Sequence, residues 1–422
     1  MGVHTVLFRM TYRRRKQRKH GRRRGTASRG PLAILVGAVI LLLGIGAVGA
    51  VGYVASIASD VPSIDQLKPI DKGRTSVIYS ADGKRLGFIA GDQLRTPIPG
   101  DEIPADALKA TVAIEDKRFY QHDGVDYEGV ARAVVANVVS GRNEQGGSTI
   151  TMQLVRNLYI SAERTFERKI REAKAAQELE AKHSKKWILY RYLNSVPYGT
   201  VGGKTAVGIQ AAARTFFAKP AKDLQLHEAA LLAGLPQAPS LYNPFRDPQT
   251  ALVRRNEVLD AMAQQKDITR EQAAEAKKKP LGVKSNTFYS RQRESYFFDY
   301  VTQQLIDRYG VNTVRRGGLE ITSTVKLNLQ DAARKAIDGQ LYLPDDPRSA
   351  IVTIDPKNGH IVAMASSASY SQSKFNLAAQ GKRQPGSTFK VMVLMTALNR
   401  GVDPKSTTYT SKPLNFVDPN YG

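Results

Sequence analysis

The pattern of apolar and polar positions along the chain begins with a long uncharged stretch. Residues 32–58 contain no Asp, Glu, Lys or Arg. At a rise of about 1.5 Å per residue they predict a helix of about 40 Å, which exceeds the roughly 30 Å core of a bilayer. A cleaved signal peptide is the alternative, but its apolar region usually has only about 7–15 residues, and residues 56–58 form a poor cleavage site. The pattern therefore predicts a transmembrane helix at 31–59.

The next part of the chain has mainly helical periodicity. Residues 62–104 mix Gly and Pro with short alternating runs such as residues 76–79, which predicts a stalk containing strands. Beyond them, apolar residues recur at helical spacing to about residue 265. We place one mostly α domain, with its stalk, at 60–265. Helix start signals precede the helices predicted at 127–139, 185–193 and 249–262.

A linker and a mixed region follow the helical part. The basic run at 277–279 precedes Pro280 and breaks the helical periodicity, so residues 266–345 are assigned to a linker or pedestal. Apolar runs flank a Pro-Lys-Asn-Gly turn at 356–359, which predicts a hairpin, and a buried helix is predicted at 387–399. Strands and helices together indicate an α+β domain at 346–422. The chain ends soon after that helix, so we expect this domain to be incomplete.

Charge is concentrated at the N-terminus. Of the net charge of +24, the first 30 residues supply 11 Lys or Arg and no Asp or Glu. A basic segment before a membrane span stays in the cytoplasm, so residues 1–30 predict a cytoplasmic tail and extracytoplasmic domains beyond the span. Nucleic-acid binding is the alternative for such a tail, but beside a span a topology signal that contacts anionic lipids is favoured. No nucleic-acid partner is expected. The chain has no Cys, which excludes disulfides and thiolate metal sites.

Candidate chemistry in the helical domain lies in three short segments. Residues 115–118, Glu-Asp-Lys-Arg, stand beside an apolar helical face, although such mixtures usually form a solvated surface. Residues 146–151, Gly-Gly-Ser-Thr-Ile-Thr, precede a helix, an arrangement that receives anionic oxygens at a helix N-terminus. Arg168 and Glu172 lie four apart on one helical face, where a surface ion pair is the simplest interpretation. Each segment alone is a weak signal.

The longer segments that contain these three, 115–124, 146–157 and 168–180, together with residues 188–199, resemble the motifs of family 51 glycosyltransferases and occur in the same order. The resemblance continues through residues 226–239 and 254–256. The resemblance covers roughly residues 62–265. It implies a lysozyme-like α fold. It also implies an enzyme that polymerises lipid II into glycan strands at the bacterial membrane and releases polyprenyl pyrophosphate. Glu115 is then the general base that takes the proton of the acceptor sugar hydroxyl. A carboxylate in a partly desolvated cleft suits that role, because desolvation raises its pKa.

The resemblance implies that Glu172 is the second catalytic residue. It would lie near the pyrophosphate, acting either through a divalent cation, Mg or Mn, or by orienting Arg168 and Lys169. No organic cofactor is expected. Charged neighbours would offset the leaving group, and hydroxyl and amide groups would hold sugar and phosphate. The residues predicted to bind substrate are Asp116, Lys117, Arg118, Phe119, His122, Ser148, Thr149, Gln153, Arg156, Asn157, Arg168 and Lys169. The sequence departs from the usual family pattern at Met152, Arg156, Tyr190 and Pro197.

A second motif lies near the end of the chain. Residues 384–390 place Ser387 at a helix start and Lys390 one turn later, where a neutral, desolvated Lys can accept the hydroxyl proton. Ser-x-x-Lys alone is common, and a capping serine is the alternative. With residues 354–359 and 375–376, the segment resembles the transpeptidase domain of class A penicillin-binding proteins, which has a serine β-lactamase-like fold.

This second resemblance implies that Ser387 is an acylated nucleophile and Lys390 its base. The substrates would be D-alanyl-D-alanine stem peptides, and β-lactams would acylate the serine in a complete domain. Neither a Ser-x-Asn nor a Lys-Thr-Gly partner motif follows Lys390 in these 422 residues. We therefore do not expect this chain to cross-link peptides.

Two other functions compete with the glycosyltransferase. A lysozyme-like hydrolase would act on finished glycan, whereas the basic motif set and the predicted anchor suit a lipid pyrophosphate donor. A wall-assembly scaffold without activity would be unaffected by Glu115→Gln. The glycosyltransferase hypothesis requires Glu115 to face a cleft shared with Glu172.

Overall fold

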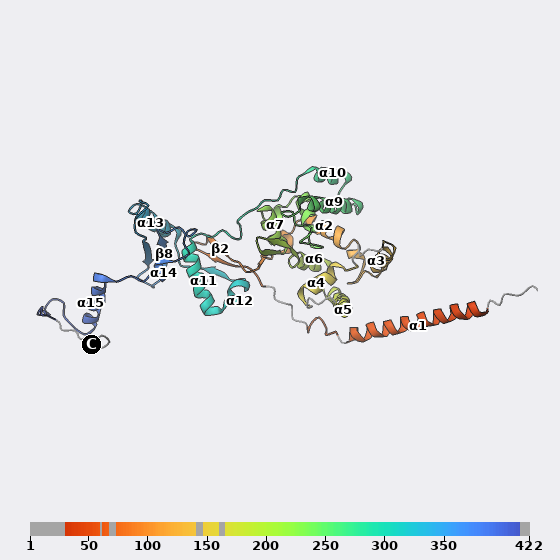
Figure 1. The fold of residues 1–422 in the computed structure, drawn as a ribbon, viewed down its shortest axis with the longest axis horizontal. Coiled ribbons are helices and arrows are strands. Elements are labelled where there is room, and N and C mark those ends of the chain that lie inside the picture. The colour runs from red at the N-terminus through yellow and green to blue at the C-terminus, as the bar shows by residue number, and fades with distance from the viewer. Residues whose placement is uncertain (1–29, 60, 67–72, 141–146, 160–164, 414–422) are drawn as a thin grey trace, which may run out of the picture.

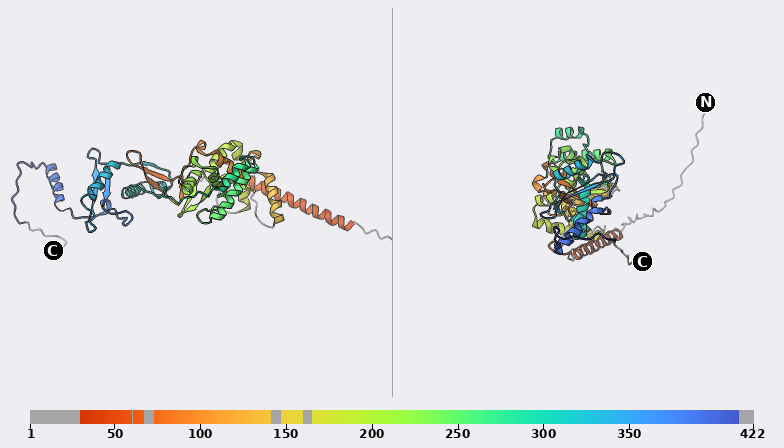
Figure 2. Two further views of the ribbon diagram at one scale, coloured as in Figure 1. Left: turned by 90° about the horizontal axis from the view of Figure 1, so that it is seen from above. Right: turned by 90° about the vertical axis from the view of Figure 1, so that its left-hand side faces the viewer.

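The computed structural model describes residues 30–59, 61–66, 73–140, 147–159 and 165–413. Figure 1 shows a helical part in the middle, a smaller mixed part beside it, and helices α1 and α15 at opposite ends. The left view in Figure 2 shows the same order along the long axis. Except for Gly30, the predicted cytoplasmic tail lies outside the described residues.

Helix α1 (Gly30–Ser59) forms over the uncharged stretch near the N-terminus. Over the residues whose placement is described, no helix is at once long enough and apolar enough to cross a membrane. The C-terminal part of α1 packs against α5 (Phe166–Lys182), where Tyr53 donates a hydrogen bond to Glu167. This contact links α1 to the helical part of the chain.

The helical part contains most of the elements that surround the later site. The predicted helices at 127–139, 185–193 and 249–262 are confirmed. The sequence analysis predicted that the basic run at 277–279 lies in a linker. Instead, a further helix runs through Lys278, so this run begins inside a helix. The helices are α2 (Ala105–Glu115), α3 (Tyr127–Ser140), α4 (Ile150–Leu158), α5, α6 (Lys185–Leu193), α7 (Ile209–Phe217), α8 (Leu226–Gly234), α9 (Pro248–Gln264) and α10 (Arg270–Lys278), with single turns η1 (Gly100–Glu102), η2 (Phe119–Gln121) and η3 (Ala221–Asp223).

Local capping explains where several of these helices begin. Ser184 accepts a hydrogen bond of 3.2 Å from the Trp187 N–H at the start of α6, and Asp247 accepts one of 3.0 Å from the Thr250 N–H at the start of α9. Thr269 and Gln272 form a reciprocal capping box that starts α10. Each bond satisfies a backbone donor that has no partner within its helix. The capping box accounts for the helix that the sequence analysis missed.

Helix α2, which carries Glu115 at its end, is held against α8 and α9. The buried contact contains small side chains, among them Ala110 and Ala113 of α2 and Ala230 of α8. Small residues let helix backbones approach closely, so the position of α2 is well determined by packing. The C-terminal end of α2 is thereby fixed between two other helices.

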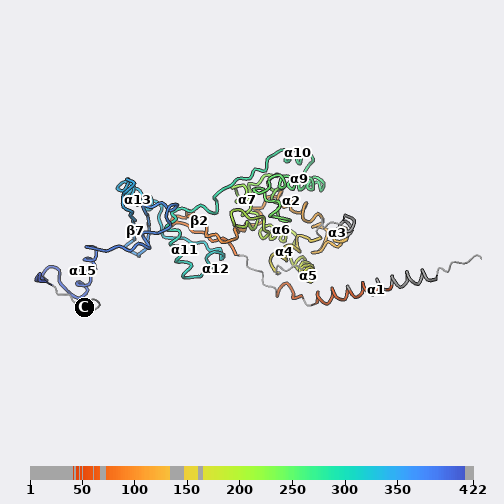
Figure 3. Tube along the Cα trace, in the orientation of Figure 1, coloured from red at the N-terminus to blue at the C-terminus, as the bar shows by residue number. Residues whose placement is uncertain are grey.

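Within the described residues, three small sheets accompany the helices. In the first, β1 (Ser76–Tyr79) pairs antiparallel with β2 (Arg85–Ile89) and parallel with β6 (Glu320–Thr322), a strand far along the chain. Figure 3 traces the chain as it leaves the helical part after α10 and returns beside β2. The second sheet has the order β3-β5-β4, with strands β3 (Gln93–Arg95), β4 (Pro197–Val201) and β5 (Lys204–Val207).

The mixed region contains the third sheet. The predicted hairpin is confirmed by the antiparallel pair β7 (Ala350–Ile354) and β8 (Ile361–Ser366). A helix also forms near the predicted place, but the prediction that it is buried is wrong, since none of its residues is buried. The described residues provide no packed layer over its apolar side chains. The helices here are α11 (Ser295–Tyr309), α12 (Val311–Arg316), α13 (Leu327–Asp338), α14 (Leu377–Gln380) and α15 (Phe389–Asn399), with η4 (Gly386–Thr388) before the last.

Candidate active site

A cavity of about 500 Å³ opens at the C-terminal end of α2. Its wall is formed by residues of α2, α3, α4 and α9, by residues 116–118 between α2 and η2, and by the segment after α8. Cationic side chains outnumber acidic ones in this wall, which favours an anionic ligand. The charged residues that line it are Glu115, Asp116, Lys117, Arg118, Asp126, Arg132, Arg156 and Arg254.

Glu115 is the last residue of α2 and points its carboxylate into this cavity wall. Gln153 of α4 donates a hydrogen bond of 2.8 Å to its Oε2, while its Oε1 is shielded from solvent and has no hydrogen-bond partner. The residue as a whole is half-buried and lines the cavity. Burial raises the pKa of Glu115, against the opposing effect of the Gln153 hydrogen bond and of Arg254 and Arg156. One oxygen is therefore held by Gln153, and the other is desolvated and has no hydrogen-bond partner.

The Gln153 amide is itself oriented by a buried tyrosine. The Tyr192 hydroxyl of α6 donates a hydrogen bond of 3.1 Å to the Gln153 carbonyl oxygen, so the amide nitrogen must face Glu115. Burial, and secondarily the charge of Glu115, raises the pKa of Tyr192 well above its ordinary value. The phenol thus stays protonated, and this chain of donors from α4 and α6 fixes the carboxylate at the end of α2.

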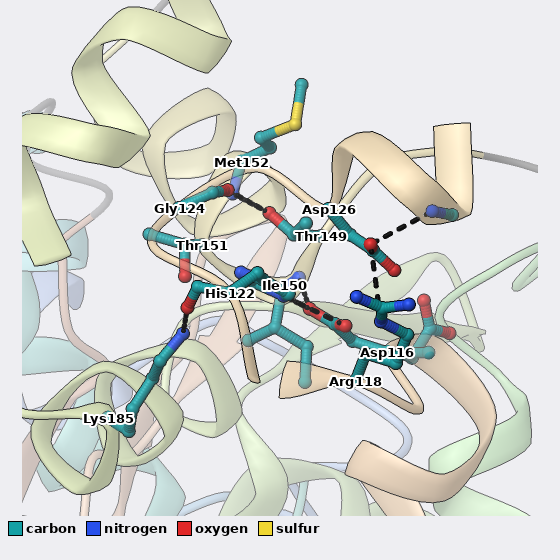
Figure 4. Close-up of polar contacts among 12 residues, drawn as sticks. Asp116, Arg118, His122, Gly124, Asp126, Thr149, Ile150, Thr151, Met152 and Lys185 are labelled. Carbon is teal, nitrogen blue, oxygen red and sulfur yellow. Dashed lines mark hydrogen bonds and ion pairs between the residues drawn. The ribbon is translucent and has the colours of Figure 1, made fainter. Parts of the chain in front are cut away.

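Asp116 lies next to Glu115 but makes structural contacts. Its carboxylate accepts a 3.0 Å hydrogen bond from the Ile150 N–H at the start of α4 and contacts His122 Nε2 at 3.1 Å (Figure 4). The sequence analysis expected the N-terminus of this helix to receive an anionic oxygen. That oxygen belongs to the protein's own Asp116. The carboxylate joins the end of α2 to the start of α4 and so fixes both sides of the cavity.

Two of the aromatic residues predicted to bind substrate lie behind the cavity wall. Phe119 is fully buried in the core, with the Lys185 ammonium 4.6 Å from its ring centre. His122 is buried on Asp116, and its carbonyl oxygen accepts a hydrogen bond from Lys185. Neither lines the cavity, and Asn157 does not line it either. Any effect of Phe119 or His122 on substrate would act through the wall residues that they support.

The rim of the cavity is organised by Arg118 and Thr149. Arg118 forms ion pairs with Asp126 and Glu128, and its pKa is raised chiefly by the bond to Glu128. Thr149 donates a 2.6 Å hydrogen bond to the Gly124 carbonyl and accepts one of 3.1 Å from the Met152 N–H, which caps α4 (Figure 4). These contacts fasten the loop after η2 to α4. Lys117, by contrast, is exposed at the mouth.

Glu172 is fully buried on α5 and is surrounded by cations. Its Oε1 lies 3.1 Å from Arg168 Nε and its Oε2 lies 3.2 Å from Lys169 Nζ, which confirms the predicted Arg168–Glu172 pair but places it in the interior. Lys169 also donates a hydrogen bond to Ser148, which lines the cavity. Glu172, Arg168 and Lys169 do not line the cavity, so the expectation that Glu115 and Glu172 share one cleft is wrong, because Glu172 is turned into the interior by its two ion pairs. Of the three, Lys169 contacts the lining, through Ser148.

The surroundings of Glu172 do not suit a divalent cation. Magnesium and manganese prefer several oxygen ligands, whereas Glu172 is a single carboxylate that faces two positive side chains. Within the described ranges, no three His, Cys, Asp or Glu side chains stand close enough to hold a metal ion. The donor set therefore does not fit a metal at Glu172, and no step is assigned to one.

The sequence analysis missed Arg254 and Arg132 as members of the wall. Arg254 of α9 is buried, donates hydrogen bonds to the Gly234 carbonyl at 3.3 Å and to Glu257 at 2.9 Å, and lies over the Tyr242 ring. Residues 254–256 belong to the family resemblance, which gives Arg254 no role. The available signal was helical spacing, because Arg254 lies three residues after Ala251 and four before Val258, and so on the same apolar helical face.

Ser387 and Lys390 are in a different environment. Ser387 is in η4 and Lys390 is in the first turn of α15, as the spacing predicted, but both side chains are exposed. The expectation of a desolvated Lys390 is therefore wrong for this chain, because no described side chain buries it. The spacing is present without the surroundings that would activate the serine.

Comparison with known protein families gives two matches along the chain. Residues 82–263 match the transglycosylase family, and residues 349–421 match the penicillin-binding protein transpeptidase domain. The first match contains the cavity and Glu115. The second contains the β7–β8 hairpin, Ser387 and Lys390.

Similar proteins are found among characterised relatives. Penicillin-binding protein 1A of Aquifex aeolicus is 33% identical over 93% of this chain and 62% of the relative, and penicillin-binding protein 2D of Bacillus subtilis is 35% identical over 78% of this chain and 48% of the relative. The chain thus spans about half to three fifths of the length of these relatives. The crystal structure of penicillin-binding protein 1A from Haemophilus influenzae aligns with a TM-score of 0.42 and 22% identity, covering 78% of this chain and 53% of that one.

Proposed function

The chain belongs to the class A penicillin-binding proteins, and from this premise we propose that residues 60–265 form a peptidoglycan glycosyltransferase with a lysozyme-like helical fold. It would polymerise lipid II into glycan strands and release polyprenyl pyrophosphate. The observation that carries the proposal is the placement of Glu115, a desolvated carboxylate with one free oxygen in the wall of a cationic cavity. Such a group can accept a proton and is surrounded by charges that suit a diphosphate substrate.

In the proposed reaction, Glu115 takes the proton of the acceptor sugar hydroxyl. The hydroxyl oxygen forms a bond to the anomeric carbon of the growing chain, and the bond from that carbon to the pyrophosphate breaks. The electron pair leaves with the pyrophosphate. Because Gln153 holds Oε2 of Glu115, the unpartnered Oε1 is the atom assigned to the proton.

The departing negative charge would be met by cations on the α4 and α5 side of the cavity. Arg156 lines the cavity directly, and Lys169 reaches it through the Ser148 hydroxyl. Glu172 positions Lys169 and Arg168 by its two ion pairs. In this proposal Glu172 acts on the leaving group through these cations, and no divalent cation at Glu172 is required.

We further propose that residues 31–59 anchor the protein in the bacterial cell membrane as a single span, with the N-terminus in the cytoplasm. The support is the absence of charge at 32–58 and the basic residues before it. Helix α1 joins the domain through α5, on which Arg168, Lys169 and Glu172 stand. A lipid-linked pyrophosphate would thus be handled on the helix nearest the anchor.

The second domain is proposed to be the front part of a penicillin-binding transpeptidase, with Ser387 as the nucleophile and Lys390 as its base. The family match over residues 349–421 and the one-turn spacing of the two side chains support these roles. Stem peptides and β-lactams are the ligands that the family implies for the whole domain.

The experiment that tests the proposed glycosyltransferase supplies purified protein with lipid-linked disaccharide pentapeptide and separates the glycan products by length. Polymer is expected from the wild type, and Glu115→Gln should reduce its rate by about 10²–10⁴-fold, the usual contribution of a general base. The matched control is Glu102→Gln, an exposed glutamate of η1 just before α2. Polymer formed at equal rates by wild type and Glu115→Gln would rule out the assigned base, whereas no polymer from either protein would favour the scaffold without activity.

A further inference from the structure

We propose that a second hollow beside the active-site cavity binds sugars of the glycan strand. This inference rests on the proposed glycosyltransferase and assigns a site to the polymer that the reaction makes. The hollow has a volume of about 360 Å³, within the range of about 300–1,000 Å³ common for small-ligand sites. It adjoins the cavity at Lys117, which lines both spaces. A strand held here would be continuous with the reacting sugars.

The hollow combines an apolar floor with an exposed aromatic ring. Leu108 and Val112, one turn apart on α2, form part of the floor, and Tyr120 of η2 stands at its side with 66% of its surface exposed. Sugar rings present C–H groups on their faces and hydroxyls around their edges. A tyrosine ring offers an apolar face with a polar tip, which matches such a ligand.

Polar residues from α2, η2 and the segment after α9 line the hollow together with the Tyr120 ring. Lys109 of α2 and Asp267, which follows α9, meet through a 3.4 Å hydrogen bond from the Lys109 ammonium to the Asp267 carbonyl. Gln265, which also lines the hollow, donates a 3.1 Å hydrogen bond to the Ala113 carbonyl and has a side-chain oxygen that can act as an acceptor. Gln121 adds an amide. Donors and acceptors around an aromatic face suit a hydroxyl-rich chain better than a purely anionic ligand.

The position of the hollow agrees with the direction of the substrate. Helix α5, which carries Lys169 and Glu172, lies on the side of α1 (Figure 1). The hollow is built from α2 and the turn between α9 and α10, and Figure 1 shows α9 and α10 on the opposite side of the domain. A chain whose pyrophosphate end lies toward α5 extends its sugars away from α1, toward Tyr120. The hollow is therefore where the strand beyond the reacting sugar would lie.

Strand length provides the first test. Tyr120→Ala removes the aromatic face, so the average length of the strands made from lipid-linked disaccharide is expected to fall several-fold, with a smaller fall in the rate of the first coupling. Tyr120→Phe keeps the ring and should keep most of the length. Tyr342→Ala, at an exposed tyrosine far along the chain, is the matched control and should change neither quantity. Strands of wild-type length from Tyr120→Ala would overturn the proposal.

Direct binding separates this site from the proposed reaction. The ligand is a soluble glycan oligomer that lacks the lipid and pyrophosphate, and its contact with the full chain is followed by saturation-transfer NMR. Binding by the wild type, weakened at least several-fold in Tyr120→Ala and unchanged in Tyr342→Ala, supports the hollow even if no polymer forms, in which case only the proposed reaction fails. Polymerisation without oligomer binding, or binding that Tyr120→Ala leaves intact, rejects the hollow and leaves the reaction standing. Equal thermal unfolding midpoints of the variants exclude a folding defect.

Discussion

Glu115 and Ser387 both lie in recognisable family motifs, but the side chains around them differ. Glu115 is held by buried neighbours, whereas Ser387 is exposed. Glu115 is held by Gln153, which is oriented by Tyr192, so three helices determine one carboxylate. Ser387 and Lys390 have the expected spacing on η4 and α15, yet both are exposed. The comparison shows that a motif supplies the reacting atoms, whereas desolvation and oriented neighbours supply their reactivity. The proposed polymerisation is therefore assigned to the first region.

The largest effect on the first region, after loss of Glu115 itself, is expected from Lys169→Met. The variant removes the cation between Ser148 and Glu172, so the departing diphosphate is less stabilised. Loss of one such electrostatic group typically costs about 10²–10³ in rate. The initial polymerisation rate measures it, and Lys174→Met, which lies on the same helix and pairs with Glu178, should retain the wild-type rate. Equal losses in both variants would point to damage to α5 and not to the leaving group.

A smaller, pH-dependent effect is expected from Gln153→Met. The Gln153 amide stabilises the ionised form of Glu115, so its removal raises the pKa of that carboxyl further. The base must be ionised to accept a proton, and the acid side of the pH–rate profile should therefore move to higher pH. A hydrogen bond to a charged group contributes about 1.5–3 kcal/mol, which corresponds to tenfold or more in the rate at low pH. An acid limb that stays in place or moves to lower pH would show that Gln153 does not act on the base.

Tyr192→Phe should shift the acid limb of the pH–rate profile less than Gln153→Met does. It removes the hydroxyl that orients Gln153 but keeps the amide next to Glu115. The acid limb should move in the same direction by a smaller amount.

The smallest effect is expected at Ser387. Because Lys390 is exposed in this chain, the serine hydroxyl should not be activated, and a fluorescent β-lactam should label the 422-residue protein no more than it labels Ser387→Ala. Gel fluorescence after denaturation measures the covalent adduct. Specific labelling of Ser387 would break the comparison, because it would show that the motif alone is sufficient.

The parts of the fold that could be predicted are those with local causes. Ser184 and Asp247 cap helices close to the predicted bounds, and the Pro-Lys-Asn-Gly turn gives the expected hairpin. The Arg168–Glu172 pair follows from helical spacing, although its burial does not. Local signals fix where elements begin and which side chains are neighbours along a helix.

What could not be predicted depends on contacts between distant segments. Nothing near Glu115 in the sequence indicates that Tyr192 orients its partner, or that Arg254 completes the cavity wall. The parallel pairing of β1 with β6 is likewise a tertiary event. The exposure of α15 was missed because its apolar composition describes what the helix could bury and not what packs on it.

The titration of the Glu115 carboxyl tests the central claim most directly. Carbon-13 NMR of protein labelled at the glutamate carboxyls, compared between wild type and Glu115→Gln, identifies the signal and follows it with pH. Burial with one unpartnered oxygen predicts a pKa above the ordinary value for glutamate. A signal that titrates at or below that value would show a solvated carboxylate and would contradict the assignment of Glu115 as a desolvated base.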